Sequence, residues 1–246
     1  DKLFVRNIST GSEEELLFSD ENIYVPGISL IQKDRNTNNV YLGYSSPKTP
    51  SRVYLYNLQN KSKKLVKEQE IPSGHNSDDY IVERVEYKSH DGRLVPLTIT
   101  RHKKTKIDGS ANLLLYGYGS YGSSMSPNFS STRLSLINRG IIWATAHVRG
   151  GMEKGMKWWK EGKLTNKKNT FEDYICAAKY LIDEKYSSKG KIIGMGGSAG
   201  GLLMGAVVNQ APELFLGFIM AVPFVDSLTT NLDHSLPLTV GEFDEL

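Results

Sequence analysis

The chain has 246 residues, a length that suits one large α/β domain or two smaller ones. Apolar residues make up 39% of it and charged residues 23%, which excludes collagen-like, coiled-coil and wholly disordered proteins. A net charge of +3 is too weak a field to favour nucleic acid or an anionic membrane as the main partner. The single cysteine, Cys176, excludes a disulfide framework and fits a reducing, cytoplasmic compartment.

Neither a membrane span nor a cofactor site is predicted. The longest apolar stretches, at 202–208 and 214–222, contain glycines and are shorter than the roughly 18 residues that a membrane span needs. We therefore expect no membrane-crossing segment and no signal peptide. The chain has no nucleotide-binding fingerprint and no metal-ligand spacing, so it is assigned no cofactor.

Residues 1–77 predict a region of short antiparallel strands. Extended segments recur at 3–5, 28–31, 40–44 and 53–56, separated by clusters of Gly, Asn, Ser and Pro. Evenly spaced short strands are typical of propeller blades, but so few strands cannot close a propeller ring. The stretch 67–79 is polar and rich in turn residues, so we place a domain boundary between residues 77 and 78.

From residue 78 onward, strands alternate with helices. Strands are expected at 80–87, 94–101, 112–116, 141–148, 191–195 and 215–222. Helices are expected at 129–138, 171–186 and 199–209, and Asn169 or Thr170 can cap the second of them. This order requires a mainly parallel sheet with helices on both faces, which is an α/β fold.

Residues 196–200 read Gly-Gly-Ser-Ala-Gly and fit the nucleophile elbow G-x-S-x-G, between a predicted strand and a predicted helix. Glycines beside Ser198 remove Cβ atoms that would collide with the neighbouring strand and helix. The alternatives are a glycine-rich turn packed for its own sake and a phosphate loop, but the Gly-Lys-Ser/Thr ending of a phosphate loop is missing. Ser198 is therefore predicted to be a nucleophile at the carboxyl edge of the sheet.

A serine nucleophile needs hydrogen-bond donors for the oxyanion that forms in the tetrahedral state, each worth roughly 3 kcal/mol. The amide N–H of Ala199, the residue after the nucleophile, is one expected donor. Residues 116–122 read Tyr-Gly-Tyr-Gly-Ser-Tyr-Gly, in place of the His-Gly-Gly-Gly loop of many esterases. The hydroxyl of Tyr118 is the expected second donor.

Several segments resemble the prolyl oligopeptidase family of serine peptidases. They are LYGYGSYG at 115–122, HVRGG at 147–151, KNTFEDY at 168–174, GGSAGG at 196–201 and NQAPELF at 209–215. PFVD at 223–226, TT at 229–230 and PLTVGEFDE at 237–245 narrow the resemblance to the oligopeptidase B, or protease II, branch. The resemblance covers nearly the whole chain.

The resemblance implies an enzyme that cuts short peptides after Arg or Lys through an acyl-enzyme, with an α/β-hydrolase domain capped by a seven-bladed propeller. Residues 1–77 would be the last part of that propeller, and residues 78–246 the N-terminal part of the peptidase domain. By motif position, Ser198 would be the nucleophile, and Tyr118 with the N–H of Ala199 would stabilise the oxyanion.

Glu242 and Asp244 would receive the basic side chain of the substrate. In an extended chain, residues two apart face the same way, so both carboxylates could address one guanidinium. The alternative is that Glu242, Asp244 and Glu245 form a solvated acidic end.

Two departures from the family pattern stand out. Met152 follows Arg149-Gly150-Gly151, where the family usually has a third glycine, so a Cβ stands at a backbone position that glycine normally fills. Residues 126–128 read Ser-Pro-Asn, where the branch tends to carry acidic residues for a second basic subsite. A preference for paired basic residues is therefore not supported.

The catalytic base is expected to be absent from this chain. In α/β-hydrolases the triad runs Ser, then Asp or Glu, then His, and in the family the segment 237–245 precedes both missing partners. The one histidine after Ser198 is His234, which we expect to be a loop residue. Loss of the serine or histidine from such a unit costs on the order of 10⁶ in kcat, so the isolated chain is expected to be nearly inactive.

A complementary C-terminal chain would supply the missing triad Asp and His, and short basic peptides would be the substrates. The alternatives are another α/β-hydrolase, such as an esterase, and a non-catalytic fragment that acts only by association.

His147 precedes the serine and is expected to pack or to orient a loop. The basic stretch 154–168, with its two tryptophans, is interpreted as a solvated active-site loop rather than a nucleic-acid surface.

Overall fold

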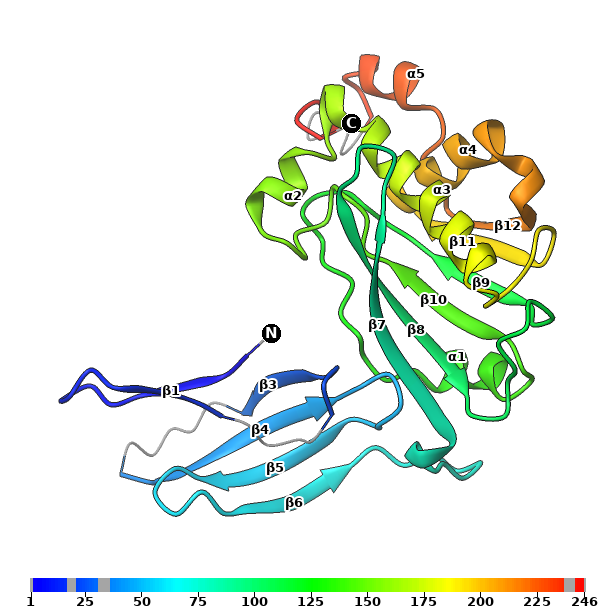
Figure 1. The fold of residues 1–246 in the computed structure, drawn as a ribbon. Helices are drawn as coiled ribbons and strands as arrows, with labels where there is room; N and C mark the ends of the chain where they lie inside the picture. The colour runs from blue at the N-terminus through cyan, green and yellow to red at the C-terminus, as the bar shows by residue number, and fades with distance from the viewer. Residues whose placement is uncertain (1, 17–20, 31–35, 237–241, 246) are drawn as a thin grey trace. The chain divides into compact units, whose positions relative to one another are not determined.

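The structure, a computed structural model, describes residues 2–16, 21–30, 36–236 and 242–245 (Figure 1). The chain forms two compact units. One is built from Asp1–Tyr80 and Ser126–Thr132, and the other from Ile81–Met125 and Arg133–Leu246. The main chain thus changes unit at Tyr80, while the domain boundary that we place at residues 77 and 78 remains a prediction for the complete protein.

The first unit holds a four-stranded antiparallel sheet in the order β3-β4-β5-β6, the size of one propeller blade. Its strands are Val25–Leu30 (β3), Asn39–Ser45 (β4), Arg52–Asn57 (β5) and Lys63–Glu68 (β6). A separate hairpin pairs Phe4–Arg6 (β1) with Glu13–Glu15 (β2). Strands β2 and β6 are not predicted from the sequence, because their charged runs lack an apolar alternation.

The second unit is built on a six-stranded sheet in the order β12-β11-β9-β10-β8-β7. Its strands are Tyr80–Lys88 (β7), Leu94–His102 (β8), Leu113–Tyr116 (β9), Ile142–Ala146 (β10), Ile192–Gly197 (β11) and Phe215–Ala221 (β12). Strand β9 is parallel to β10 and β11, and β11 is parallel to β12, whereas β8 is antiparallel to β10. The mainly parallel sheet confirms the predicted α/β fold.

Short and long helices connect these strands. The α-helices are Ser131–Ile137 (α1), Met156–Lys160 (α2), Lys168–Asp183 (α3), Ala199–Gln210 (α4) and Ser227–Leu232 (α5). Turns of 3-10 helix cover Ser77–Asp79 (η1), Leu164–Asn166 (η2) and Pro212–Leu214 (η3). Within the described residues, no helix is long and apolar enough to pass through a membrane.

Helix α3 begins earlier than predicted, and the predicted cap is wrong. Lys167 occupies the N-cap position, without a side-chain cap. The Asn169 side chain donates instead to the carbonyl of Glu161, and the Thr170 hydroxyl donates to that of Arg149. Both side chains are used by contacts with preceding loops, which local sequence patterns cannot reveal.

The core of the second unit lies between the sheet and helices α3 and α4, which contact each other. Leu115 of β9, Leu181 of α3 and Leu203 of α4 are fully buried. Burying such a side chain contributes about 2 kcal/mol. This packing holds the carboxyl ends of β9 and β11 side by side, with the loops that follow them at one edge of the sheet.

Candidate active site

Ser198 stands at a sharp turn between strand β11 and helix α4. Its backbone is at φ 53° and ψ −119°, a region that L-residues rarely occupy, and the residue is exposed. A Cβ on Gly196 would collide with the carbonyl oxygen of Gly200. The Ser198 N–H donates to the carbonyl of Ala221 (2.9 Å), and the Phe224 N–H donates to that of Ser198 (3.0 Å). The turn is therefore tightly held, and the serine faces solvent.

The loop after strand β9, residues 117–122, lies beside this turn, and we call it the Tyr118 loop. The Gly117 N–H donates to the carbonyl of Met195, 3.1 Å away, in the C-terminal half of β11. Burial raises the pKa of Tyr118, and a hydrogen bond with the Ser198 side chain acts in the opposite direction. The Tyr118 hydroxyl thus keeps its proton near neutral pH and lies next to Ser198.

The amide N–H of Ala199 is the third polar group at this turn, beside the hydroxyls of Ser198 and Tyr118. Ala199 is the first residue of α4, and N–H groups of a first helical turn have no partner within the helix. The helix dipole adds partial positive charge at this end. The structure therefore brings together Ser198, Tyr118 and Ala199, the three residues predicted to act on a carbonyl group.

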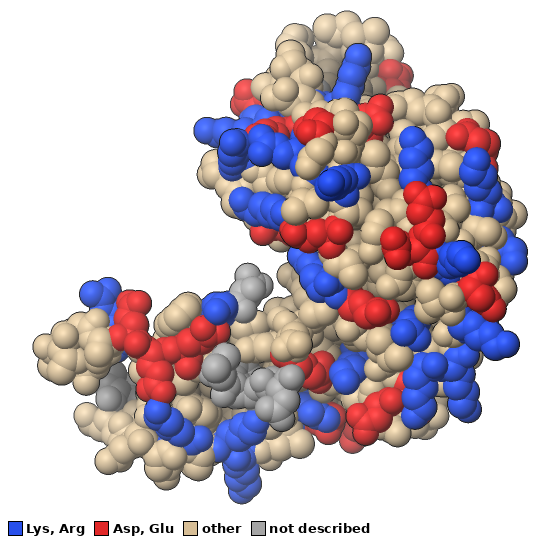
Figure 2. Space-filling model, in the orientation of Figure 1, with Lys and Arg blue, Asp and Glu red and all other residues tan. Residues whose placement is uncertain are grey.

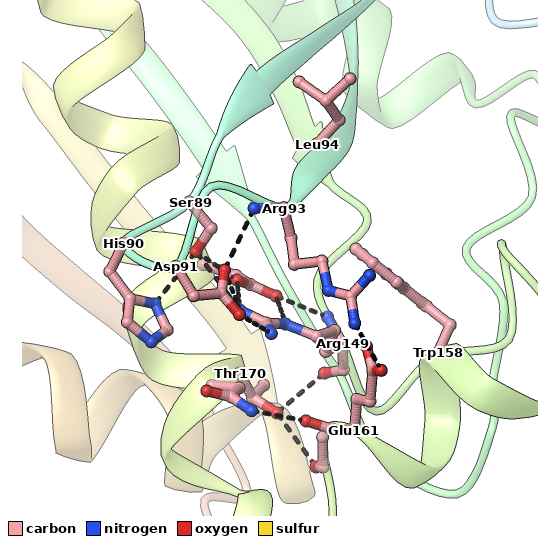
Figure 3. Close-up of polar contacts among 12 residues, drawn as sticks. Ser89, His90, Asp91, Arg93, Leu94, Arg149, Trp158, Glu161 and Thr170 are labelled. Atoms are coloured by element: carbon pink, nitrogen blue, oxygen red, sulfur yellow. Dashed lines mark hydrogen bonds and ion pairs between the residues drawn. The ribbon is translucent and has the colours of Figure 1, made fainter.

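Arg149 is a buried arginine in the loop that follows strand β10. Its hydrogen bonds anchor this second loop, which packs against the Tyr118 loop (Figure 3). Arg149 is 1% exposed, and its Nε and one terminal nitrogen donate to Asp173 at 2.9 and 2.6 Å. Its other terminal nitrogen donates to Asp91, 2.6 Å away in the turn between β7 and β8. Burial alone would lower the pKa of Arg149, but the bonds to Asp173 and Asp91 raise it, so the guanidinium stays charged.

Gly150, next to Arg149, touches the Tyr118 loop directly. The carbonyl of Gly150 accepts the N–H of Gly122 at 3.0 Å, and a Cβ at Gly150 would collide with the carbonyl of Gly119. The two loops can pack this closely only because position 150 is a glycine, with φ at 97°. Met152 is 37% exposed, and the end of its side chain lies against Gly122, so the residue that replaces the usual third glycine packs on the Tyr118 loop.

His147 lies in a buried polar network and not at the serine. The residue is 1% exposed; its Nε2 lies 2.8 Å from the Thr98 hydroxyl and 2.9 Å from Arg84, and its Nδ1 lies 3.2 Å from Glu153. Burial lowers the pKa of His147. This environment is that of a packing residue. Among the described residues, no histidine is hydrogen-bonded to the Ser198 side chain; His234 is exposed and stacks near Phe243.

The acidic residues near the C-terminus form a helical turn, so the extended geometry expected for them is wrong. The carboxylate of Glu242 accepts the Tyr121 hydroxyl at 2.7 Å, Asp244 is exposed, and its carbonyl accepts from Lys163 at 2.7 Å. Glu245 is 3% exposed, which contradicts a solvated acidic end for this residue. Residues 237–241 of the same motif lie outside the described residues.

The basic stretch 154–168 is more ordered than expected for a solvated loop. It contains α2 and η2, and Trp158 is 5% exposed with its indole N–H on the carbonyl of His147. Lys167 is 8% exposed, and Lys163 lies 4.0 Å from the centre of the Trp159 ring. On the face drawn in Figure 2, described lysines and arginines are interspersed with acidic residues. Trp158 and Lys167 therefore pack inward, whereas most of the stretch is exposed without forming a uniform basic surface on that face.

Comparison with known proteins identifies the family. Residues 127–246 match the prolyl oligopeptidase family model. The chain is 43% identical over 242 residues to dipeptidyl aminopeptidase BI of Pseudoxanthomonas mexicana, and 44% identical over 226 residues to protease 2 of Moraxella lacunata. These matches cover 98% and 92% of this chain, but 33% of each relative.

Solved structures agree with this result. Oligopeptidase B from Leishmania major is 36% identical with a TM-score of 0.89, and the match covers 99% of this chain and 35% of that one. Oligopeptidase B from Trypanosoma brucei with covalently bound antipain is 38% identical, also with a TM-score of 0.89, over 96% of this chain and 33% of that one. This chain belongs to the prolyl oligopeptidase family and spans about a third of the length of the curated, oligopeptidase B-like relatives that it matches.

Proposed function

We propose that this chain is the nucleophile-bearing part of a serine oligopeptidase that cleaves short peptides after Arg or Lys. The observation that carries the proposal is the exposed, strained Ser198, with the Tyr118 side chain and the N–H of Ala199 beside it. A hydroxyl in this setting can attack a peptide carbonyl, while preplaced donors meet the charge that develops on the carbonyl oxygen.

In the proposed reaction, the Ser198 oxygen forms a bond to the carbonyl carbon, and the oxyanion accepts hydrogen bonds from Tyr118 and Ala199. The serine proton passes to a histidine base and then to the leaving amine as the C–N bond breaks. Water, deprotonated by the same base, then releases the acyl group. We propose that this base and its acidic partner come from polypeptide outside this chain, which leaves the chain by itself nearly inactive.

The proposed preference for basic residues rests on Glu242 and Asp244. Asp244 is exposed and Glu242 partly so, and Glu242 is bonded to Tyr121, three residues after Tyr118. A guanidinium or ammonium at this turn would lie close to the Tyr118 loop. Two of the similar structures are named oligopeptidase B, the branch whose resemblance implies this substrate class.

The proposed partner polypeptide has a surface to bind. In the described sheet, β12 is an edge strand, and unpaired edges and apolar patches favour association. Large apolar side chains on and after this strand are exposed: Leu216, Ile219, Val222, Val225, Leu228 and Leu232. We propose that strands carrying the triad Asp and His cover this edge. The protein is proposed to be cytoplasmic, since its single thiol, Cys176, has no partner cysteine.

Complementation tests the proposal. The chain is assayed alone and mixed with the polypeptide that follows the matched region in the Moraxella lacunata relative, using a fluorophosphonate label and Arg-, Glu- and short acyl-ester reporter substrates. We expect labelling and hydrolysis of the Arg substrate to appear only in the mixture, and to vanish with Ser198→Ala. Labelling that survives Ser198→Ala refutes the role of Ser198 as the nucleophile. Preferential hydrolysis of the acyl ester indicates an esterase, and a mixture that binds without reacting indicates a non-catalytic fragment.

A further inference from the structure

Lys167 holds the Tyr118 loop from inside the protein. It is 8% exposed, and its ammonium donates to the carbonyl of Gly119 at 2.8 Å and to the hydroxyl of Ser120. Ser120 is fully buried, so this amine and hydroxyl cannot reach a substrate. Burial lowers the pKa of Lys167 to about 8, although Glu245 and Glu242 act in the opposite direction.

Glu245 holds the next peptide group. One carboxylate oxygen accepts the N–H of Tyr121, and the other accepts the indole N–H of Trp159 at 2.8 Å. The carbonyl of Glu245 also accepts the N–H of Leu164 at 3.0 Å. A buried carboxylate is thereby bonded both to the loop and to the segment that leads into α3.

The loop needs such support because its backbone is strained at Tyr121, whereas the glycines at 119 and 122 adopt positive φ without that cost. Gly119 has φ at 74°, Tyr121 at 59° and Gly122 at 63°. A tyrosine in this region costs on the order of 1–3 kcal/mol and persists only where surrounding contacts enforce it. The contacts of Lys167 and Glu245 fall on residues 119–121, directly after Tyr118.

Burying two charges is an expensive way to stabilise a fold, because the desolvation penalty can exceed the attraction. Hydrogen bonds to fixed backbone groups, in contrast, set geometry, and an oxyanion donor is useful only if it is already in place. We infer that Lys167 and Glu245 are positioning residues that hold the Tyr118 hydroxyl at the oxyanion site by clamping the three residues after it. This inference rests on the proposed function.

Two independent measurements test the clamp. The first is amide hydrogen exchange of residues 118–122 in the chain alone, which requires no activity. The second is the split between kcat and KM for an Arg substrate in the complemented protein. The variants are Lys167→Met and Glu245→Gln, with Lys168→Met and Glu213→Gln as matched controls, because Lys168 and Glu213 are exposed. Ser120→Ala is a milder variant that removes one bond to Lys167 and carries the test if Lys167→Met does not fold.

We expect exchange in the loop to rise about tenfold or more in the clamp variants, and kcat to fall roughly 10- to 100-fold with KM nearly unchanged, as for misplacement of one oxyanion donor. The controls should match the parent chain in both measurements. Unchanged loop exchange in both clamp variants overturns the inference, as does faster exchange with unchanged kcat, or a rise in KM alone. If the complemented parent protein cleaves nothing, the proposed function fails and the positioning role fails with it, whereas the exchange data still report whether the clamp exists.

Discussion

Gly200, in the first turn of helix α4, lies against the ring of Tyr118. A Cβ at position 200 would be 3.2 Å from Cδ2 of Tyr118 and 2.9 Å from the carbonyl oxygen of Gly117. The second glycine of the nucleophile motif therefore does more than permit a sharp turn. It lets the Tyr118 loop approach the start of the helix, where Ser198 and the N–H of Ala199 are found.

Gly200→Ala should push the Tyr118 loop away from the helix. The contact with the Gly117 carbonyl is too short for a real Cβ, so backbone must shift, and we expect a loss of about 1–3 kcal/mol in the free energy of unfolding. In the complemented protein, kcat should fall as well. Gly205→Ala is the control, because its Cβ would meet only a Val225 methyl at 3.3 Å. Equal stability of the two variants would contradict the close approach.

Tyr118→Phe removes one proposed oxyanion donor and little else. We expect kcat for an Arg substrate to fall about 10²- to 10³-fold, with KM and the unfolding midpoint nearly unchanged. Steady-state kinetics in the complemented protein measure this. A rise in KM with unchanged kcat would instead make Tyr118 a substrate-binding residue.

Arg149→Met should destabilise the second unit strongly. Asp173 is fully buried and would lose its charged partner. We therefore expect the free energy of unfolding, measured by chemical denaturation, to fall by about 3–5 kcal/mol. Adding Asp173→Asn to this variant should restore part of the lost free energy of unfolding. Arg93→Met is the matched control, because Arg93 is half exposed and its ion pair with Glu161 is worth less than about 1 kcal/mol. Similar losses for the two arginines would refute the anchoring role of Arg149.

The lowered pKa of Lys167 predicts a pH dependence of stability. Its pKa is about 8 in the folded protein against 10.5 for an ordinary lysine, so between these values the folded state has lost a proton that the unfolded state keeps. Stability should therefore rise with pH across this window, by up to about 3 kcal/mol, as the penalty of the buried charge is relieved. The neutral amine still donates to Gly119 and Ser120.

Other groups titrate in the same range, so the quantity to compare is the difference between the parent chain and Lys167→Met. Urea denaturation of both at pH 7, 8, 9 and 10 measures it. The parent should gain stability relative to the variant above pH 8. A constant difference, or one that changes in the opposite direction, would show that Lys167 is not buried as a charged group.

The sequence alone determined the α/β fold, the elbow at Ser198 and the family, because each is encoded by patterns among residues that lie close together in the chain. Apolar periodicity specifies β9 to β12 and helices α3 and α4, and the glycines around Ser198 specify the turn. Only the tertiary structure decided which charged side chains became buried. Lys167 and Glu245 resemble surface residues in their own segments, and Asn169 and Thr170 resemble helix caps. Their roles come from backbone groups distant in sequence, and local patterns cannot encode those partners because burial is decided by how the loops pack together.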